Sequence, residues 1–258
     1  MNWFEAIILG IVQGLTEFLP VSSSGHLELG KFLFGIDAES NFYFTLAVHG
    51  ATVLSTLAVF WKEILDLFKG LFRFSMNEET TYLLKMAVSM IPVGIAGFFM
   101  KDIVENFFTG NMTILGIQFL ITALFLVFPY FIKSKERSIT YTDAFIIGIA
   151  QAFAILPAIS RSGATIATGL MLGNRKEEIA KFSFLMVLVP ILGANFVELM
   201  SSDIVADKTG IGVIIMGFIA AFISGYFACK WMITLVKKSR LIWFAIYCAI
   251  VGLISILL

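Results

Sequence analysis

Long apolar runs alternate with short polar connections along this chain. Six of the runs are long enough to cross a bilayer, because a spanning helix needs about 20 apolar residues. The pattern therefore predicts spanning helices at 42–60, 81–100, 112–132, 178–200, 210–236 and 241–257.

Two further apolar stretches, 2–36 and 142–173, are interrupted by a proline and a cluster of serine and glycine, at Pro20 and at Pro157. Each flanking piece has about 15 residues and would span about 22 Å as a helix, less than the hydrocarbon core of a bilayer. Non-helical backbone at membrane depth is tolerated only beside protein or a watery cavity. We therefore expect an all-α polytopic membrane protein with six spanning helices and two re-entrant helical hairpins.

Composition supports this class of protein. The chain is 59% hydrophobic and 14% charged, with a mean hydropathy of +0.94, whereas soluble domains are about 45–50% apolar and about 25% charged. These values exclude a soluble globule, a disordered chain and a nucleic-acid-binding surface. Cys229 and Cys248 lie in apolar runs and are expected to be small buried hydrophobes. The whole chain, 1–258, is predicted to be one integral membrane domain.

The basic residues test the predicted topology. With two re-entrant segments, the connections 61–80, 133–141, 174–177 and 237–240 fall on one side, and with the adjoining helix ends they hold 14 of the 18 basic residues. The positive-inside rule places this side in the cytoplasm. Both termini are then expected outside. Lys31, Lys101 and Lys208 are expected on the outer side, among acidic residues.

The two broken segments resemble each other. Gly10, Gln13, Ser24 and Gly25 each recur 138 positions later. Repeat 1 covers about 2–132 and repeat 2 about 142–257, and each broken segment is followed by three spans. Because three is odd, the second copy is predicted to be inverted in the membrane, and inverted repeats with broken helices place their binding site where the breaks meet.

Polar side chains gather at the first break. Gln13 and Glu17 are four residues apart and share one helix face, and a charge at membrane depth is a functional-site hypothesis by default. Pro20 is followed by three hydroxyls, a glycine and an imidazole, where a helix is expected to restart, and such an N-terminus favours anions. These residues are Ser22, Ser23, Ser24, Gly25 and His26.

The second break adds a permanent cation, Arg161, whose planar fork suits phosphate oxygens. Its neighbours are Ser160, Ser162, Gly163 and Thr165. A carboxylate suits a divalent cation that bridges phosphate oxygens, and an imidazole suits proton transfer. Metal-assisted phosphoryl transfer is the chemistry that uses all of these groups.

The two motifs resemble the signatures of the bacterial undecaprenyl-diphosphate phosphatase family, the bacitracin-resistance proteins. They are Gln13-x-x-x-Glu17 with the segment 18–26, and Pro157-x-x-Ser160-Arg161-Ser162-Gly163-x-Thr165. The resemblance covers nearly the whole chain. It implies hydrolysis of the C55 lipid carrier diphosphate to the monophosphate for cell-wall synthesis, with Mg²⁺ or Ca²⁺, at a site that faces the outer side of the membrane.

Residue by residue, the resemblance implies metal or substrate roles for Glu17, with Gln13 assisting. His26 would be a general acid/base or nucleophile, Ser23 a nucleophile, and Arg161 a phosphate ligand. The remaining hydroxyls and glycines would bind substrate. Two positions depart from the usual pattern: Gln13, where many members have Glu, is a weaker metal ligand, and Ala158, where Gly is usual, alters the second elbow.

Several alternatives stay open. Glu17 could be a structural carboxylate paired with Arg161, His26 could cap a helix, and metal-bound water could attack without a covalent intermediate. His49 is expected to be a packed, hydrogen-bonded histidine, and Gln151 an internal hydrogen-bond donor. The same site could serve a transporter or flippase for phosphorylated polyprenyl lipids. The expected partners are this lipid substrate and membrane lipids, with no nucleic acid, and assembly as a homodimer stays open.

Overall fold

The structure is a computed structural model that describes residues 1–36, 41–99, 111–132, 135–201, 209–238 and 241–258. Every named element in these ranges is helical. They are α1 (Trp3–Phe18), α2 (Ser23–Phe34), α3 (Phe42–Val59), α4 (Trp61–Leu71), α5 (Glu78–Phe99), α7 (Met112–Val127), the 3-10 helix η2 (Phe128–Phe131), α8 (Tyr141–Phe153), α9 (Arg161–Met171), α10 (Lys176–Met186), α11 (Leu188–Ser201), α12 (Ile211–Lys237) and α13 (Leu241–Leu257).

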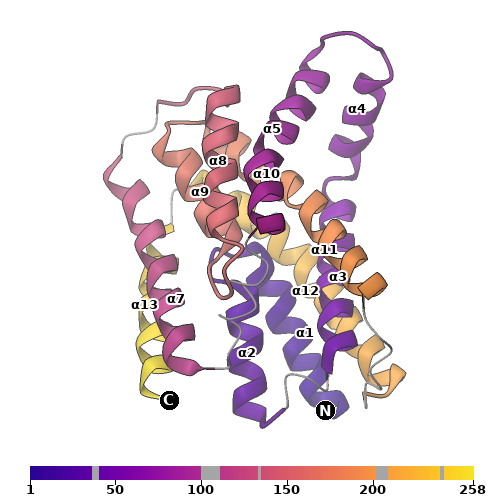
Figure 1. Cartoon of the computed structure of the whole chain (residues 1–258), viewed down its shortest axis with the longest axis vertical. Coiled ribbons are helices and arrows are strands. Elements are labelled where there is room, and N and C mark those ends of the chain that lie inside the picture. The colour runs from indigo at the N-terminus through magenta and orange to yellow at the C-terminus, as the bar shows by residue number, and fades with distance from the viewer. Residues whose placement is uncertain (37–40, 100–110, 133–134, 202–208, 239–240) are drawn as a thin grey trace.

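The two broken segments are helical hairpins, as predicted. Helices α1 and α2 are joined by a short elbow, and α8 and α9 by a longer one. Local sequence sets the outer ends, because Asn2 with Glu5 and Thr140 with Asp143 form capping boxes at α1 and α8. The four helices are about 24, 18, 20 and 16 Å long. Figure 1 shows the hairpins approaching from opposite ends of the molecule, with their elbows meeting near its middle.

Four helices are long and apolar enough to cross a membrane: α3, α5, α7 continued by η2, and α12. They correspond to predicted spans. Helix α13 matches the predicted run 241–257 but has 17 residues. The span expected at 178–200 is not one helix: α10 ends at Met186 and α11 begins at Leu188. Pro190 explains the division, because it has no N–H to donate and its ring crowds the carbonyl four residues earlier.

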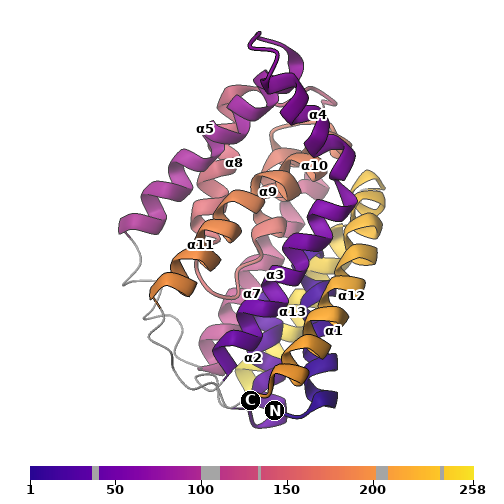
Figure 2. The same ribbon diagram turned by 90° about the vertical axis from the view of Figure 1, so that its right-hand side faces the viewer.

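Helix α4 was not predicted, since it falls in the connection expected at 61–80. It is strongly amphipathic, with Trp61 and Phe68 more than half exposed and Lys62 and Lys69 among its polar residues. The α4–α5 connection projects beyond the rest of the molecule (Figures 1 and 2). Both chain termini lie at the opposite end. The α4–α5 connection, which carries Arg73, therefore lies away from the termini. Lys101 and Lys208 lie outside the described residues.

Glycines allow the hairpins to pack closely on long helices. Helix α1 packs mainly against α12, and α8 mainly against α5. A Cβ atom at Gly10 would lie 2.4 Å from the Gly217 carbonyl oxygen, and one at Gly148 would lie 2.3 Å from the Ser89 carbonyl oxygen. Gly10 and Gly148 are equivalent positions of the sequence repeat. The repeated glycine thus makes the same backbone-to-backbone contact in both halves of the fold.

Candidate active site

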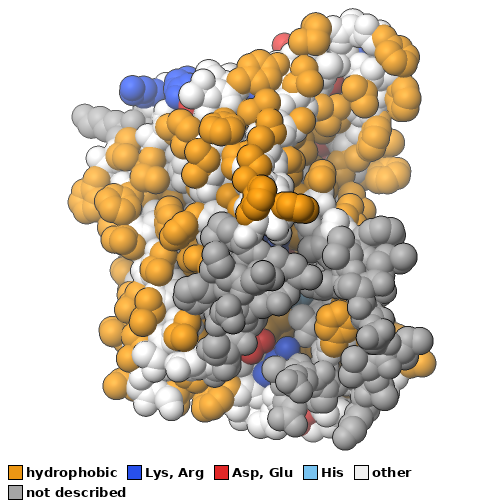
Figure 3. All heavy atoms as spheres, viewed as in Figure 1, with side chains coloured by type: hydrophobic (Ala, Val, Ile, Leu, Met, Phe, Trp, Pro, Cys, Tyr) orange, Lys and Arg blue, Asp and Glu red, His pale blue; other side chains and the backbone are white. Residues whose placement is uncertain are grey.

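A cavity of about 870 Å³ lies where the two elbows meet. Its walls come from α1, α2, α3 and α5 on one side of the sequence, and from the α8–α9 elbow, α9, α10 and α11 on the other. Figure 3 shows a recess in the surface, with acidic and basic side chains lying next to each other inside it. The cavity therefore holds a group of polar and charged side chains within a molecule whose surface is rich in apolar side chains.

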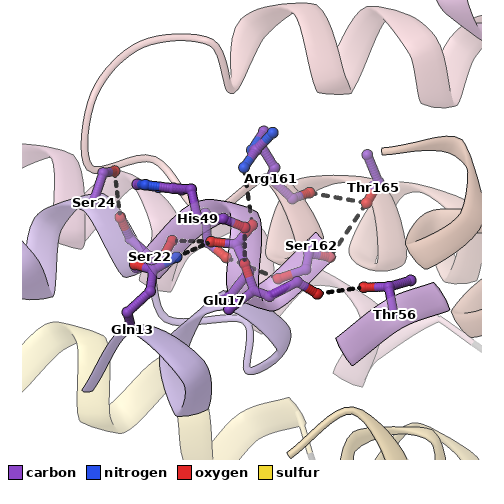
Figure 4. A network of polar contacts seen from close by, with 12 residues as sticks. Gln13, Glu17, Ser22, Ser24, His49, Thr56, Arg161, Ser162 and Thr165 are labelled. Atoms are coloured by element: carbon purple, nitrogen blue, oxygen red, sulfur yellow. Dashed lines mark hydrogen bonds and ion pairs between the residues drawn. The ribbon is translucent and has the colours of Figure 1, made fainter. Parts of the chain in front are cut away.

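Glu17 is the centre of the polar network in this cavity (Figure 4). Its Oε1 atom accepts a hydrogen bond from the Arg161 Nη2 group at 2.9 Å, and its Oε2 atom accepts from the Ser23 hydroxyl at 2.5 Å and the Gln13 Nε2 group at 3.0 Å. The Glu17 side chain is 9% exposed and that of Arg161 is 28% exposed. A carboxylate, a hydroxyl and a guanidinium from three helices are thus in direct contact.

The local sequence explains how these groups converge. Glu17 lies in the last turn of α1, one turn after Gln13 on the same face. The elbow then reverses the chain, and Ser22, with φ +70°, caps α2 by accepting a hydrogen bond from the Gly25 N–H. Ser23, the first residue of α2, is thereby directed back towards Glu17.

The three consecutive serines have different surroundings. The Ser22 hydroxyl is used by the helix cap, and the Ser24 hydroxyl accepts a hydrogen bond from the backbone N–H of Ala158 on the other hairpin. Only the Ser23 hydroxyl among these three donates to the Glu17 carboxylate. Gly25 has to be a glycine, because a Cβ atom there would lie 2.8 Å from the Phe119 ring.

The second elbow is built in a similar way. Ser160 caps α9 by accepting from the Gly163 N–H, which leaves Arg161 as the first residue of that helix. The Ser162 hydroxyl donates to the carbonyl oxygen of Leu19 in the first elbow. The Thr165 hydroxyl donates a hydrogen bond to the Arg161 carbonyl oxygen at 2.8 Å. It shares a second hydrogen bond with the Ser183 hydroxyl. Of the five predicted residues of this motif, Ser160, Arg161, Ser162 and Thr165 line the cavity, and Gly163 does not.

Ala158 departs from the usual family pattern at a demanding position. Its φ angle is +55°, in the left-handed region where a side chain costs about 1–2 kcal/mol and glycine costs little. A Cβ atom built at Gly25 would lie 3.0 Å from the Ala158 Cβ. The second elbow therefore keeps the glycine-type backbone conformation, and its methyl group packs against the first elbow.

His26 lies behind the first elbow and does not line the cavity. Its ring is held at both nitrogens, with Nδ1 2.7 Å from the Ser22 carbonyl oxygen and Nε2 2.7 Å from the Tyr247 hydroxyl. The ring also stacks on Tyr247 and meets the edge of Phe119. Its hydrogen bond to the first elbow is to the backbone carbonyl oxygen of Ser22. Its predicted acid/base role stays a prediction.

A different histidine lines the cavity. His49 of α3 is partly exposed there, with Nδ1 2.9 Å from the Thr45 carbonyl oxygen, and Figure 4 shows it beside Glu17 and Arg161. The pattern predicted a packed, hydrogen-bonded histidine; the hydrogen bond is present, but the ring lines the cavity. Gln151 lines the cavity too. Its predicted role as an internal hydrogen-bond donor is wrong, because neither its Nε2 nor its Oε1 has a hydrogen-bond partner among the described residues. His49 and Gln151 are both polar residues within apolar runs of the sequence. Such residues often mark functional positions in membrane proteins, so this pattern could have identified them.

A divalent cation fits this donor set in one way. Among the described residues, no group of three or more His, Cys, Asp or Glu side chains could hold a metal by itself. The Gln13 Oε1 atom, however, is buried without a hydrogen-bond partner among these residues, one helical turn from the Glu17 carboxylate. Mg²⁺ is commonly bound by one or two carboxylates together with substrate phosphates and water, and a side-chain amide oxygen is a further, weaker ligand. The residues present therefore fit a cation that is shared with a phosphorylated substrate.

Comparisons with known proteins agree with this geometry. Residues 6–254 match the family described as "Bacitracin resistance protein BacA". Similar curated proteins named undecaprenyl-diphosphatase include those of Parabacteroides distasonis (56% identical, covering 99% of this chain and 98% of the relative), Bacteroides fragilis (55%, 99% and 98%) and Carboxydothermus hydrogenoformans (42%, 100% and 98%). The chain belongs to the BacA bacitracin-resistance protein family.

Proposed function

We propose that this protein hydrolyses undecaprenyl diphosphate to the monophosphate and phosphate, and so recycles the lipid carrier for cell-wall synthesis and supports bacitracin resistance. It is then a membrane hydrolase that acts on a phosphoric anhydride. Its similar relatives are named for this activity. The observation in the structure that carries the proposal is the contact of Glu17 with both Ser23 and Arg161 inside a cavity between the two elbows.

The geometry suggests how the residues share the reaction. The Ser23 oxygen attacks the terminal phosphorus while its proton passes to Glu17 Oε2, the acceptor already in hydrogen-bond contact. The bond from that phosphorus to the bridging oxygen breaks, and the lipid monophosphate leaves with this oxygen. Arg161 binds the oxygens of the transferred group and neutralises their charge. Glu17 passes the Ser23 proton to the departing monophosphate and is a carboxylate again. Water then attacks the phosphoserine and gives a proton to Glu17, the bond from phosphorus to the Ser23 oxygen breaks, and Glu17 returns the proton to that oxygen as phosphate is released.

The other site residues orient these groups. Gln13 fixes the Glu17 carboxylate, Ser22 and Ser160 hold the two elbows, and His26 with Tyr247 braces the first elbow from behind. Glu17 and Gln13 Oε1 would hold a Mg²⁺ or Ca²⁺ ion. When bound, this cation supplies charge neutralisation for the diphosphate oxygens.

The membrane arrangement is also part of the proposal. We place six crossings at α3, α5, α7, the α10–α11 pair, α12 and α13, with the α1–α2 and α8–α9 hairpins re-entrant from opposite sides. The matched packing of Gly10 on α12 and Gly148 on α5 supports an inverted repeat. In a bacterial cytoplasmic membrane, the basic end bearing the α4–α5 connection lies inside, and the termini lie outside.

The cavity would then be open to the outer side. Lys31 and Phe42 line it near the end of the molecule that carries the termini, as the bounds of α2 and α3 place them. Apolar residues of α5 and α11, including Val93 and Ile191, form its flank. The diphosphate is expected at the elbows, with the polyprenyl tail leaving sideways past these residues into the bilayer.

The decisive experiment measures phosphate release from undecaprenyl diphosphate by the purified full chain in detergent, with and without EDTA. Wild-type protein should release phosphate only in the presence of a divalent cation. The Glu17→Gln variant should release no phosphate under either condition. Rapid quenching should trap a phosphorylated protein that Ser23→Ala lacks. Flux of the intact lipid across proteoliposomes without phosphate release would instead support a transporter and overturn the proposal.

A further inference from the structure

A second cation lines the cavity, away from Arg161, and unlike Arg161 it is buried. Lys31 lies in the last turn of α2 and is only 5% exposed. Its neighbours in the cavity lining include Glu28, Thr45 and His49. A buried ammonium group carries a desolvation cost of several kcal/mol, so its presence in a membrane protein calls for a compensating anion or a function.

The contacts of Lys31 within the described part of the chain leave donors unused. Its Nζ atom donates to the Thr45 hydroxyl at 3.1 Å, whereas the nearest Glu28 oxygen is 3.7 Å away, beyond hydrogen-bond distance. An ammonium group has three donors. The carboxylate of Glu28 is also the more accessible partner, with its side chain 27% exposed against 6% for Lys31. Glu28 therefore neutralises Lys31 only in part and can turn towards solvent.

Lys31 is connected to the reaction centre along α3. Thr45 accepts the Lys31 hydrogen bond, and the Thr45 carbonyl oxygen holds Nδ1 of His49 one helical turn further on. His49 Nε2 has no hydrogen-bond partner among the described residues, and Figure 4 shows the His49 ring beside Glu17 and Arg161. Polar groups thus follow one side of the cavity from the elbows to Lys31.

We propose that Lys31, with Thr45 and His49, forms a second phosphate-binding subsite in this cavity, outward of Arg161. This inference rests on the proposed function. The ligand chemistry is a phosphate group, which a compact ammonium binds as a point charge and which displaces Glu28 from its loose pairing. The phosphate comes either from the lipid diphosphate on its way in or from the orthophosphate released on its way out.

The test uses inorganic phosphate as a product inhibitor of the purified full chain, together with the KM for undecaprenyl diphosphate. The main variant is Lys31→Met combined with Glu28→Gln, which removes both charges and leaves no unpaired carboxylate. Lys31→Arg keeps the cation. Lys62→Met removes an exposed lysine of α4 and is the matched control. Thermal melting of each variant verifies folding.

Loss of a charge-assisted hydrogen bond should raise the inhibition constant for phosphate about 10-fold or more in the double variant. Lys31→Arg should recover most of this loss, and Lys62→Met should match wild type. An effect on the inhibition constant alone identifies released phosphate as the occupant, and a parallel rise in KM identifies the lipid headgroup. Inhibition constant and KM both within twofold of wild type in a folded double variant would overturn the subsite.

The subsite and the enzymatic activity can fail separately. Binding of inorganic phosphate to the wild-type and double-variant proteins, measured by calorimetry, needs no turnover. A wild-type protein that binds phosphate through Lys31 but releases none from the lipid would contradict the proposed function and keep the subsite. A wild-type protein that hydrolyses the lipid, with phosphate binding unchanged in the double variant, would do the reverse.

Discussion

The Glu17–Arg161 ion pair joins the two hairpins, and its removal should affect stability and turnover in different ways. In Arg161→Met the Glu17 carboxylate stays 9% exposed but loses its cation. Breaking one side of a buried pair costs about 3–5 kcal/mol. We expect about 3 kcal/mol, because Arg161 itself is 28% exposed and Glu17 keeps its hydrogen bonds to Ser23 and Gln13.

The matched variant removes both charges. In Glu17→Gln combined with Arg161→Met no buried charge is left, so stability should return to within about 1 kcal/mol of wild type. At about 2–4 °C per kcal/mol for a chain of this size, the single variant should melt about 6–12 °C below wild type, and the double variant within a few degrees of it. Phosphate release should fall by a factor of about 10³ or more in both, since each lacks the groups that contact the reacting phosphate.

The assay follows intrinsic tryptophan fluorescence during heating in detergent, together with phosphate release from undecaprenyl diphosphate. Arg161→Lys is the control, because it retains the charge without the planar fork and should recover stability more than activity. A double variant as unstable as Arg161→Met would show that the ion pair is not the source of the destabilisation. Turnover near wild type in Arg161→Met would refute the proposed catalytic arrangement.

Three further outcomes are expected. Ser23→Ala should reduce phosphate release by a factor of about 10³ with little change in melting temperature. Ser22→Ala should instead lower the free energy of unfolding by about 1 kcal/mol, because the α2 cap is lost. Equal losses of activity in the two variants would contradict this distinction. Gly148→Val should reduce stability by more than 2 kcal/mol in a melting assay, since its Cβ would lie 2.3 Å from a carbonyl oxygen, while Gly50→Val, with nothing within 4 Å of its Cβ, should not. Gln13→Glu should lower the Mg²⁺ concentration for half-maximal activity after EDTA treatment, and an unchanged value would argue against position 13 as a metal ligand.

Much of this fold follows from local sequence. The breaks at Pro20 and Pro157 lie where the pattern predicts. The caps at Asn2, Ser22 and Thr140 were not predicted, but they too depend on residues within a few positions of each other. The run 241–257 is likewise α13. The shared face of Gln13 and Glu17 is a consequence of helical spacing. Motif content also identified the family, because the paired signatures are short and contiguous.

Other features were invisible in local pattern. The sequence showed one apolar run at 178–200. It contains Pro190, but Pro92 lies inside the continuous helix α5, so a proline alone does not decide whether a run is divided. Helix α4 was predicted to be part of a connection, because only its basic residues were considered and not the spacing of its apolar residues. To predict either feature, one would have to know what the segment packs against. Apolar content indicates that a surface is buried or lies in lipid, but it does not indicate where a helix ends.

The sequence by itself determined the long apolar helices other than the divided α10–α11 pair, the two elbows and the chemical groups they carry. Tertiary structure alone decided which groups meet: Ser23 and not Ser22 or Ser24 on Glu17, His49 in the cavity while His26 lies behind the elbow, and Arg161 against a carboxylate 144 residues earlier. The physical reason is that caps and helical faces are set by neighbours along the chain. Contacts between side chains on different helices depend on the packing angles and rotations of whole helices, which glycines such as Gly10 and Gly148 allow but do not encode.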